Sequence, residues 1–180
     1  MSEILRNRLL SLSKDDFQEI IEDIFDIMRK SGCKSIEFRK FNFSAGGVSI
    51  GNNTILINEN IDYPFNDIVY IILHELGHQY QYKKYGINYA NDFWLRTLTE
   101  PTLVMAKEMV HVEDVANRYA RIKMNQYKKK FGLKESKYQS ENLSDIYHYT
   151  SIISNTVFHL KREKVNDLES INKFFKKMML

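Results

Sequence analysis

The sequence predicts an α+β fold in which a small antiparallel sheet packs on a helix-rich domain. Glycine and proline are scarce, at seven and two of 180 residues, which favours long helices over a fold with many turns. Apolar residues recur at helical spacing in several long segments. Between residues 34 and 60 the composition changes to β-branched and aromatic residues separated by glycine-containing turns, as is typical of strands.

The first amphipathic helix is predicted between residues 13 and 32. Its apolar residues fall on one helix face, Ser13 suits the N-cap position, and Gly32 suits the helix stop. Two strand-like stretches follow, "KSIEFRKFNF" and "TILIN", with the turn sequences "SAGG" and "GNN" between them. We expect these stretches to form the small antiparallel sheet.

The next helix is predicted from Pro64, which suits a first helical turn, to Gly86, which suits a stop. Residues 87 to 101 have no clear period. A second long helix is expected from about residue 102 to 130, and further helices near 144–160 and 166–178. We expect one domain spanning residues 1–180, because a chain of this length can bury a single core.

Composition sets limits on the class of protein. A charged fraction of 27% and a net charge of +3 are ordinary for a soluble protein and say little about its partners. The single cysteine, Cys33, excludes an internal disulfide and fits a reducing compartment. The first residues do not resemble a signal peptide, and the longest apolar run, residues 68–73, is too short to span a bilayer. We therefore expect a cytoplasmic protein with no membrane partner.

The stretch "HELGH" within the helix from 64 to 86 carries the chemistry. His74 and His78 lie four residues apart, which on a helix is about 6 Å along the axis and about 40° around it, so both imidazoles can reach one ion. Zinc binds imidazole nitrogens, and catalytic zinc sites keep one position for water. Glu75 occupies the position of the general base in the H-E-x-x-H motif, which has a chance of only roughly 1% of arising accidentally in this composition.

A third protein ligand must come from elsewhere. The metzincin pattern requires glycine at position 81 and histidine at position 84, where this chain has Gln81 and Lys84, so that class is excluded. A ligand from a second helix is the alternative. The nearby side chains that could ligate are Glu100, Glu108, His111, Glu113 and Asp114.

Glu113 is the best placed of these side chains. It shares a helical stripe with Asn117 and Ala120, and Ala116 lies beside them. Small residues here would let a second helix approach closely enough to share an ion. Glu100 is disfavoured because it precedes a proline, which biases it away from helical geometry.

The sequence H-E-L-G-H, followed by a helix with E-x-x-A-N-x-[aromatic]-A, resembles the gluzincin-type metallopeptidases, and most closely the ImmA/IrrE family of intracellular bacterial and phage proteases. The resemblance covers roughly residues 45 to 120. It implies a minimal zincin-like fold and one zinc ion, with His74, His78 and Glu113 as ligands. It also implies that Glu75 is the general base and that Asn117 supports a ligand rather than touching the metal. After the motif, family members continue with small and apolar residues, whereas this chain continues "RIKMNQYKKKF".

We therefore expect a zinc-dependent metalloprotease that hydrolyses peptide bonds of an intracellular protein through a zinc-bound water activated by Glu75. Tyr149 or His148 could stabilise the oxyanion. The alternative is a catalytically inactive zinc protein that binds a protein or nucleic acid through the basic stretch 118–137, where aromatic residues are interleaved with lysines. A third possibility is a structural helical domain with an accidental motif.

Overall fold

The computed structural model describes residues 3–13, 17–40, 47–50, 53–59, 63–86 and 103–139. The elements are α1 (Glu3–Ser13), α2 (Gln18–Ser31), β1 (Ser35–Arg39), β2 (Gly47–Ile50), β3 (Thr54–Asn58), α3 (Phe65–Tyr85) and α5 (Leu103–Phe131). The predicted α+β class is confirmed. The expected helices near 144–160 and 166–178 lie outside the described residues, as does the segment 87–101. No helix within the described ranges combines the length and apolarity needed to cross a bilayer.

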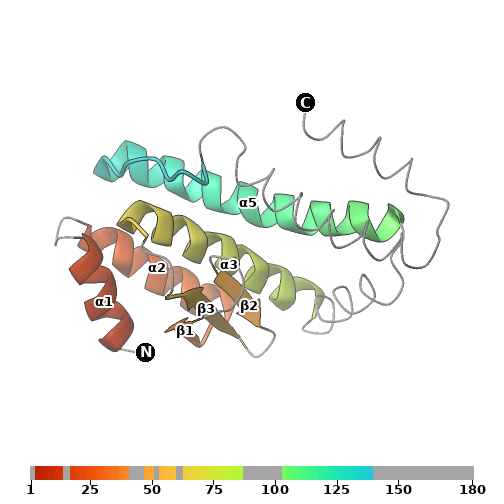
Figure 1. Ribbon diagram of the computed structural model, residues 1–180, viewed down its shortest axis with the longest axis horizontal. Helices are drawn as coiled ribbons and strands as arrows, with labels where there is room; N and C mark the ends of the chain where they lie inside the picture. Colours follow the sequence, from red (N-terminus) through yellow and green to blue (C-terminus); the bar gives the residue numbers. More distant parts are fainter. Residues whose placement is uncertain are drawn as a thin grey trace.

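Helix α3 is the centre of the fold. It lies between α5 on one side and α2 with the sheet on the other (Figure 1), and it contacts α1, α2, α5, β2 and β3. Every residue from Ile68 to Leu73 is buried, which explains why this stretch is apolar on all sides. The helix begins directly after Pro64 and ends at Gly86, whose φ of 92° is one that glycine adopts readily. Both predicted boundaries are confirmed.

The sheet differs from the prediction. Its strand order is β1-β3-β2, with β2 antiparallel and β1 parallel to β3. The prediction of an antiparallel sheet is therefore wrong for the β1–β3 pair. Asn53, at a φ of 68°, stands in the short connection between β2 and β3, and such a connection makes consecutive strands antiparallel. β3 lies between the two strands that precede it, and the outer strand β1 pairs with β3 in the parallel direction.

The start of α2 also differs from the prediction. Ser13 is not its N-cap, because Ser13 is the last residue of α1 and its hydroxyl donates to the carbonyl of Leu10, at 2.9 Å. Helix α2 begins at Gln18 and ends, as predicted, at Gly32, which has a left-handed φ of 83°. A serine near a helix boundary can cap the next helix or bond back into the preceding one, and sequence spacing does not separate the two.

Helices α2 and α5 are joined by a polar contact beside the core. The Asp23 carboxylate accepts hydrogen bonds from the Tyr127 hydroxyl at 2.7 Å and the Lys123 ammonium at 3.0 Å. Burial alone would raise the pKa of Asp23, but these two donors outweigh it and lower the pKa below its usual value. The charged form of Asp23 therefore favours the folded state.

Asp23→Asn is expected to lower the free energy of unfolding at neutral pH by about 1 kcal/mol, the usual value for a partly exposed hydrogen-bonded pair. Because the folded-state pKa is depressed, this stabilisation is present above the unfolded pKa of about 3.9 and is lost as pH falls through the folded pKa. Urea denaturation at a series of pH values should show the free energies of unfolding of wild type and Asp23→Asn becoming equal in acid. Asp26→Asn, which removes an exposed pair with Arg29 on the same helix, should change little. A difference in the free energy of unfolding between wild type and Asp23→Asn that stays the same at every pH would contradict the lowered pKa of Asp23.

The segment after α5 is fastened to the start of α3. Asp67 is buried near the N-terminus of α3, and its carboxylate accepts hydrogen bonds from the Ser136 hydroxyl at 2.8 Å and the backbone N–H of Lys137 at 3.0 Å. These bonds join the start of α3 to the segment that follows α5, at one end of the α3–α5 pair. The register of α5 against α3, on which the site depends, is fixed in part by this contact.

Candidate metal centre

Helices α3 and α5 approach closely at a glycine. A Cβ added at Gly77 would lie 3.0 Å from the Cα of Ala116 and 3.3 Å from its Cβ. Ala116 and Ala120 are both fully buried. The predicted role of small residues in a close helix contact is confirmed, and the glycine of "HELGH" supplies the other half of that contact.

Gly77→Ala is expected to destabilise the protein by about 1 kcal/mol or more, although alanine in an uncrowded helix interior is favoured over glycine by about 1 kcal/mol. The added methyl group meets the backbone of α5, which cannot rotate away. Guanidinium denaturation checks the sign of the effect. In a double-mutant cycle, Gly77→Ala and Ala116→Gly together should cost less than the sum of the two single changes, because the double variant removes one of the crowded atoms. A stability increase in Gly77→Ala alone would show that the contact is loose.

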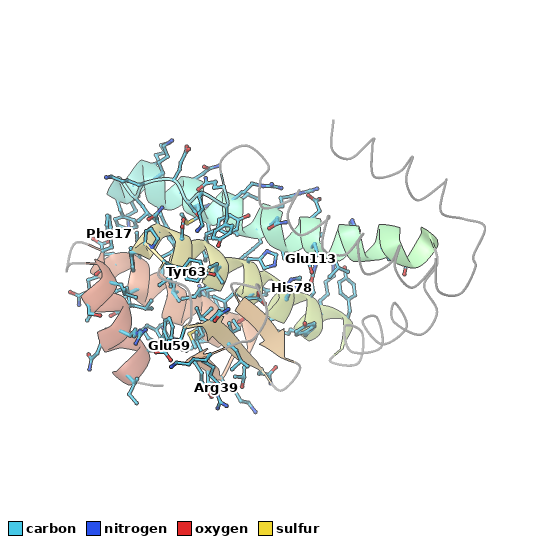
Figure 2. The ribbon with its side chains drawn as sticks, in the orientation of Figure 1. Phe17, Arg39, Glu59, Tyr63, His78 and Glu113 are labelled. Atoms are coloured by element: carbon cyan, nitrogen blue, oxygen red, sulfur yellow. The ribbon has the colours of Figure 1, made fainter. Side chains whose placement is uncertain are left out.

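Three ligating side chains converge beside this contact. His74 and His78 project from α3 and Glu113 from α5, and all three are buried. The two Nε2 atoms are 3.1 Å apart, and Glu113 Oε2 lies 3.3 Å from Nε2 of His74 and 3.6 Å from Nε2 of His78. Figure 2 shows His78 and Glu113 meeting between the two helices. The structure thus brings together the three residues selected as metal ligands.

The tautomer of His74 follows from its neighbour Asn117. The side-chain oxygen of Asn117 accepts a hydrogen bond from the Tyr70 hydroxyl at 3.1 Å and lies 3.0 Å from Nδ1 of His74. Because an amide oxygen can only accept, Nδ1 of His74 carries the hydrogen. In the neutral ring, Nε2 is then an acceptor directed at the other two ligands. Asn117 thus lies where its predicted supporting role requires, and the Tyr70 hydroxyl donates to Asn117 in turn.

The tautomer of His78 is fixed in the same way by Gln81. The Gln81 amide nitrogen donates to the Val112 carbonyl at 2.9 Å, and its oxygen lies 2.9 Å from Nδ1 of His78. The carbonyl can only accept, so the Gln81 oxygen must face His78, and Nδ1 of His78 is the donor. Nε2 of His78 is again left as an acceptor. Two imidazole lone pairs and a carboxylate oxygen therefore converge on one point.

Three converging acceptors require a cation or a proton. Burial alone would lower the pKa of His78, but the Glu113 carboxylate outweighs it and raises the pKa of His78 to about 9. Burial would likewise raise the pKa of Glu113, but the neighbouring imidazoles hold it well below its usual value. In the absence of a metal, a proton shared within this group offsets the repulsion between its acceptors.

The spacing of the three atoms also suits a tetrahedral ion. Zinc bonds of about 2.0 to 2.1 Å in a tetrahedral array require ligand atoms about 3.3 Å apart. The three observed separations, 3.1, 3.3 and 3.6 Å, lie around this value. The site therefore matches the donor set and the spacing of a cation site with two imidazoles and one carboxylate.

Glu75, the predicted general base, is buried next to this cluster on α3. Its charge contributes to raising the pKa of His78, which places Glu75 within electrostatic reach of the three clustered side chains. His111 and Glu108 are exposed, and Asp114 pairs with Arg118 at 2.8 Å rather than with the histidines. Glu100 and the two oxyanion candidates, Tyr149 and His148, lie outside the described residues.

Sequence reasoning missed two contributors, Tyr70 and Gln81. Both could have been found by helical spacing, since Tyr70 lies four residues before His74 and Gln81 lies three residues after His78, on the faces of those histidines. Their polar groups are buried beside the ligands, where a hydrogen-bond partner is required.

The basic stretch 118–137 is largely neutralised by neighbouring acids. Six of its eight basic side chains lie at most 3.6 Å from a carboxylate. The pairs are Arg118 and Arg121 with Asp114, Lys123 with Asp23, Lys128 with Glu135, Lys130 with Glu19, and Lys137 with Asp67. Pairing within the chain reduces the positive charge available for phosphates, and nucleic-acid binding through this surface stays a prediction.

Comparison with models of known protein families, with curated proteins and with solved structures found no match for this chain. What is shown is therefore an α+β protein with a buried His-His-Glu group that could hold a metal ion.

Proposed function

We propose that the protein is a zinc-dependent metalloprotease of gluzincin type that cleaves an intracellular protein. The observation that carries this proposal is the convergence of two imidazole acceptors and one carboxylate oxygen at tetrahedral spacing, with Glu75 buried beside them. Two histidines and one glutamate leave a fourth position of zinc open, as in catalytic rather than structural sites.

The roles of the chain's own residues follow from the site. A bound zinc ion would supply Lewis acidity, polarising the scissile carbonyl and lowering the pKa of water to about 7. Glu75 accepts a proton as the water oxygen bonds to the carbonyl carbon, and it returns that proton to the amine nitrogen as the C–N bond breaks. Asn117 and Gln81 hold the two imidazoles so that each presents Nε2 to the ion.

A fragment survey of the cellular proteome tests this proposal. Cells producing the wild-type protein should contain new protein N-termini that are absent from cells producing Glu75→Gln at the same level. Identical fragments in both would contradict protease activity and favour an inactive zinc protein that acts by binding. The same survey would identify the substrate class from residues flanking the cleavage sites.

A further inference from the structure

Gln81 joins the second histidine of the site to the helix that carries the third ligand. Its side chain is buried between α3 and α5, where its oxygen receives the His78 Nδ1 hydrogen and its nitrogen donates to the Val112 carbonyl. Val112 immediately precedes Glu113. One amide therefore connects one ligand directly to the backbone beside another.

We propose that Gln81 is a positioning residue for the metal, acting through His78; this inference rests on the metal site of the proposed function. The Gln81 side-chain oxygen accepts the hydrogen on Nδ1 of His78, and this leaves the lone pair of Nε2 of His78 available to the ion. The Gln81 side-chain nitrogen sets the position of α5 next to Glu113. Partners of this kind fix the orientation of a ligating imidazole and raise its basicity, and losing one typically lowers metal affinity about 10- to 100-fold.

The arrangement complements that of the first histidine. Asn117 of α5 holds His74 of α3 across the interface, whereas Gln81 holds His78 on its own helix and reaches across to α5. Each imidazole thus has an amide oxygen as its partner, and each amide contributes to the contact between the helices. The two ligands on α3 and the one on α5 are consequently placed as a unit.

Two substitutions separate positioning of His78 from helix packing. Gln81→Met is close in shape and removes both polar contacts, and it is expected to weaken zinc binding about 10- to 100-fold. Gln81→Glu keeps an acceptor for Nδ1 but cannot donate to the Val112 carbonyl. If positioning is the role, Gln81→Glu should bind zinc at least about tenfold more tightly than Gln81→Met.

The measurement is a competition titration of zinc against a chromophoric chelator on the full chain, with the visible absorption of bound Co²⁺ as a second readout. Gln79→Met, which removes a neighbouring buried amide from α3, is the matched control and should keep the wild-type affinity and Co²⁺ spectrum. An altered Co²⁺ spectrum in Gln81→Met, largely restored in Gln81→Glu, supports the inference.

Three outcomes would overturn it. Wild-type affinity in Gln81→Met would show that Gln81 does not position the site. Equal losses in Gln81→Met and Gln81→Glu, or in Gln81→Met and Gln79→Met, would show a structural role alone. If the wild-type chain itself binds neither ion, the proposed metal site fails and this inference fails with it, whereas the first two results leave the metal site standing.

Discussion

Replacing Glu75 with glutamine is expected to lower the rate of peptide-bond hydrolysis about 10²- to 10⁴-fold while zinc stays bound. Glutamine has nearly the same shape but cannot accept the proton of the attacking water. Glu75 is not one of the three converging ligands, so the change should leave zinc affinity near its wild-type value. The expected result is therefore a protein that is folded and loaded with metal but inactive.

The measurement compares hydrolysis of fluorescently labelled casein, and of any substrate found by the fragment survey, at equal zinc content. Glu108→Gln is a suitable control, because this exposed glutamate of α5 undergoes the same chemical change outside the site and should keep full activity. A wild-type rate of hydrolysis in the Glu75→Gln protein would contradict the assignment of Glu75 as the general base.

Removal of the third ligand should have the second large effect. Glu113→Ala is expected to weaken zinc binding about 100-fold or more, since structural sites with four protein ligands bind zinc by about 10 to 16 kcal/mol, which corresponds to about 3 kcal/mol for each ligand. The substitution removes the carboxylate that lies within 3.6 Å of both imidazoles. Without it, the two imidazoles remain to hold the ion.

Asp114→Ala offers a matched control for this change. Asp114 is the next residue on α5 and pairs with Arg118 and Arg121, away from the histidines. The Asp114→Ala protein should bind zinc as tightly as the wild type in a chelator competition at neutral pH. Affinity in Glu113→Ala within about twofold of wild type would mean that another group supplies the third ligand.

The parts of the fold that sequence predicted well are those with strong local signals. Helix α3 carries a proline at its start, a glycine at its end and an unbroken apolar run, so its boundaries followed directly. The contact between the helices was predicted from Ala116 and Ala120, because small side chains on one stripe allow a neighbouring helix to approach closely. The three candidate metal ligands were chosen from spacing and donor chemistry rather than from the fold, and they lie together in the structure.

The errors arose where distant contacts decide the outcome. Nothing local indicates that β1 pairs with β3 in parallel, because that pairing depends on which edge of the hairpin is free. The error at Ser13 is instead a local one, because its hydroxyl bonds back to the Leu10 carbonyl of α1 rather than capping α2. Helical spacing places Tyr70 and Gln81 beside the two histidines, but it does not give their contacts with α5, which contributes the Asn117 amide and the Val112 carbonyl.

The central claim is that one divalent ion is held by His74, His78 and Glu113. Crystals grown with zinc and measured at the zinc absorption edge test it most directly. We predict one anomalous peak about 2.0 to 2.1 Å from both Nε2 atoms and about 2.0 to 2.2 Å from the Glu113 carboxylate. A map with no peak between these three side chains, or with zinc bound elsewhere on the chain, would contradict the account.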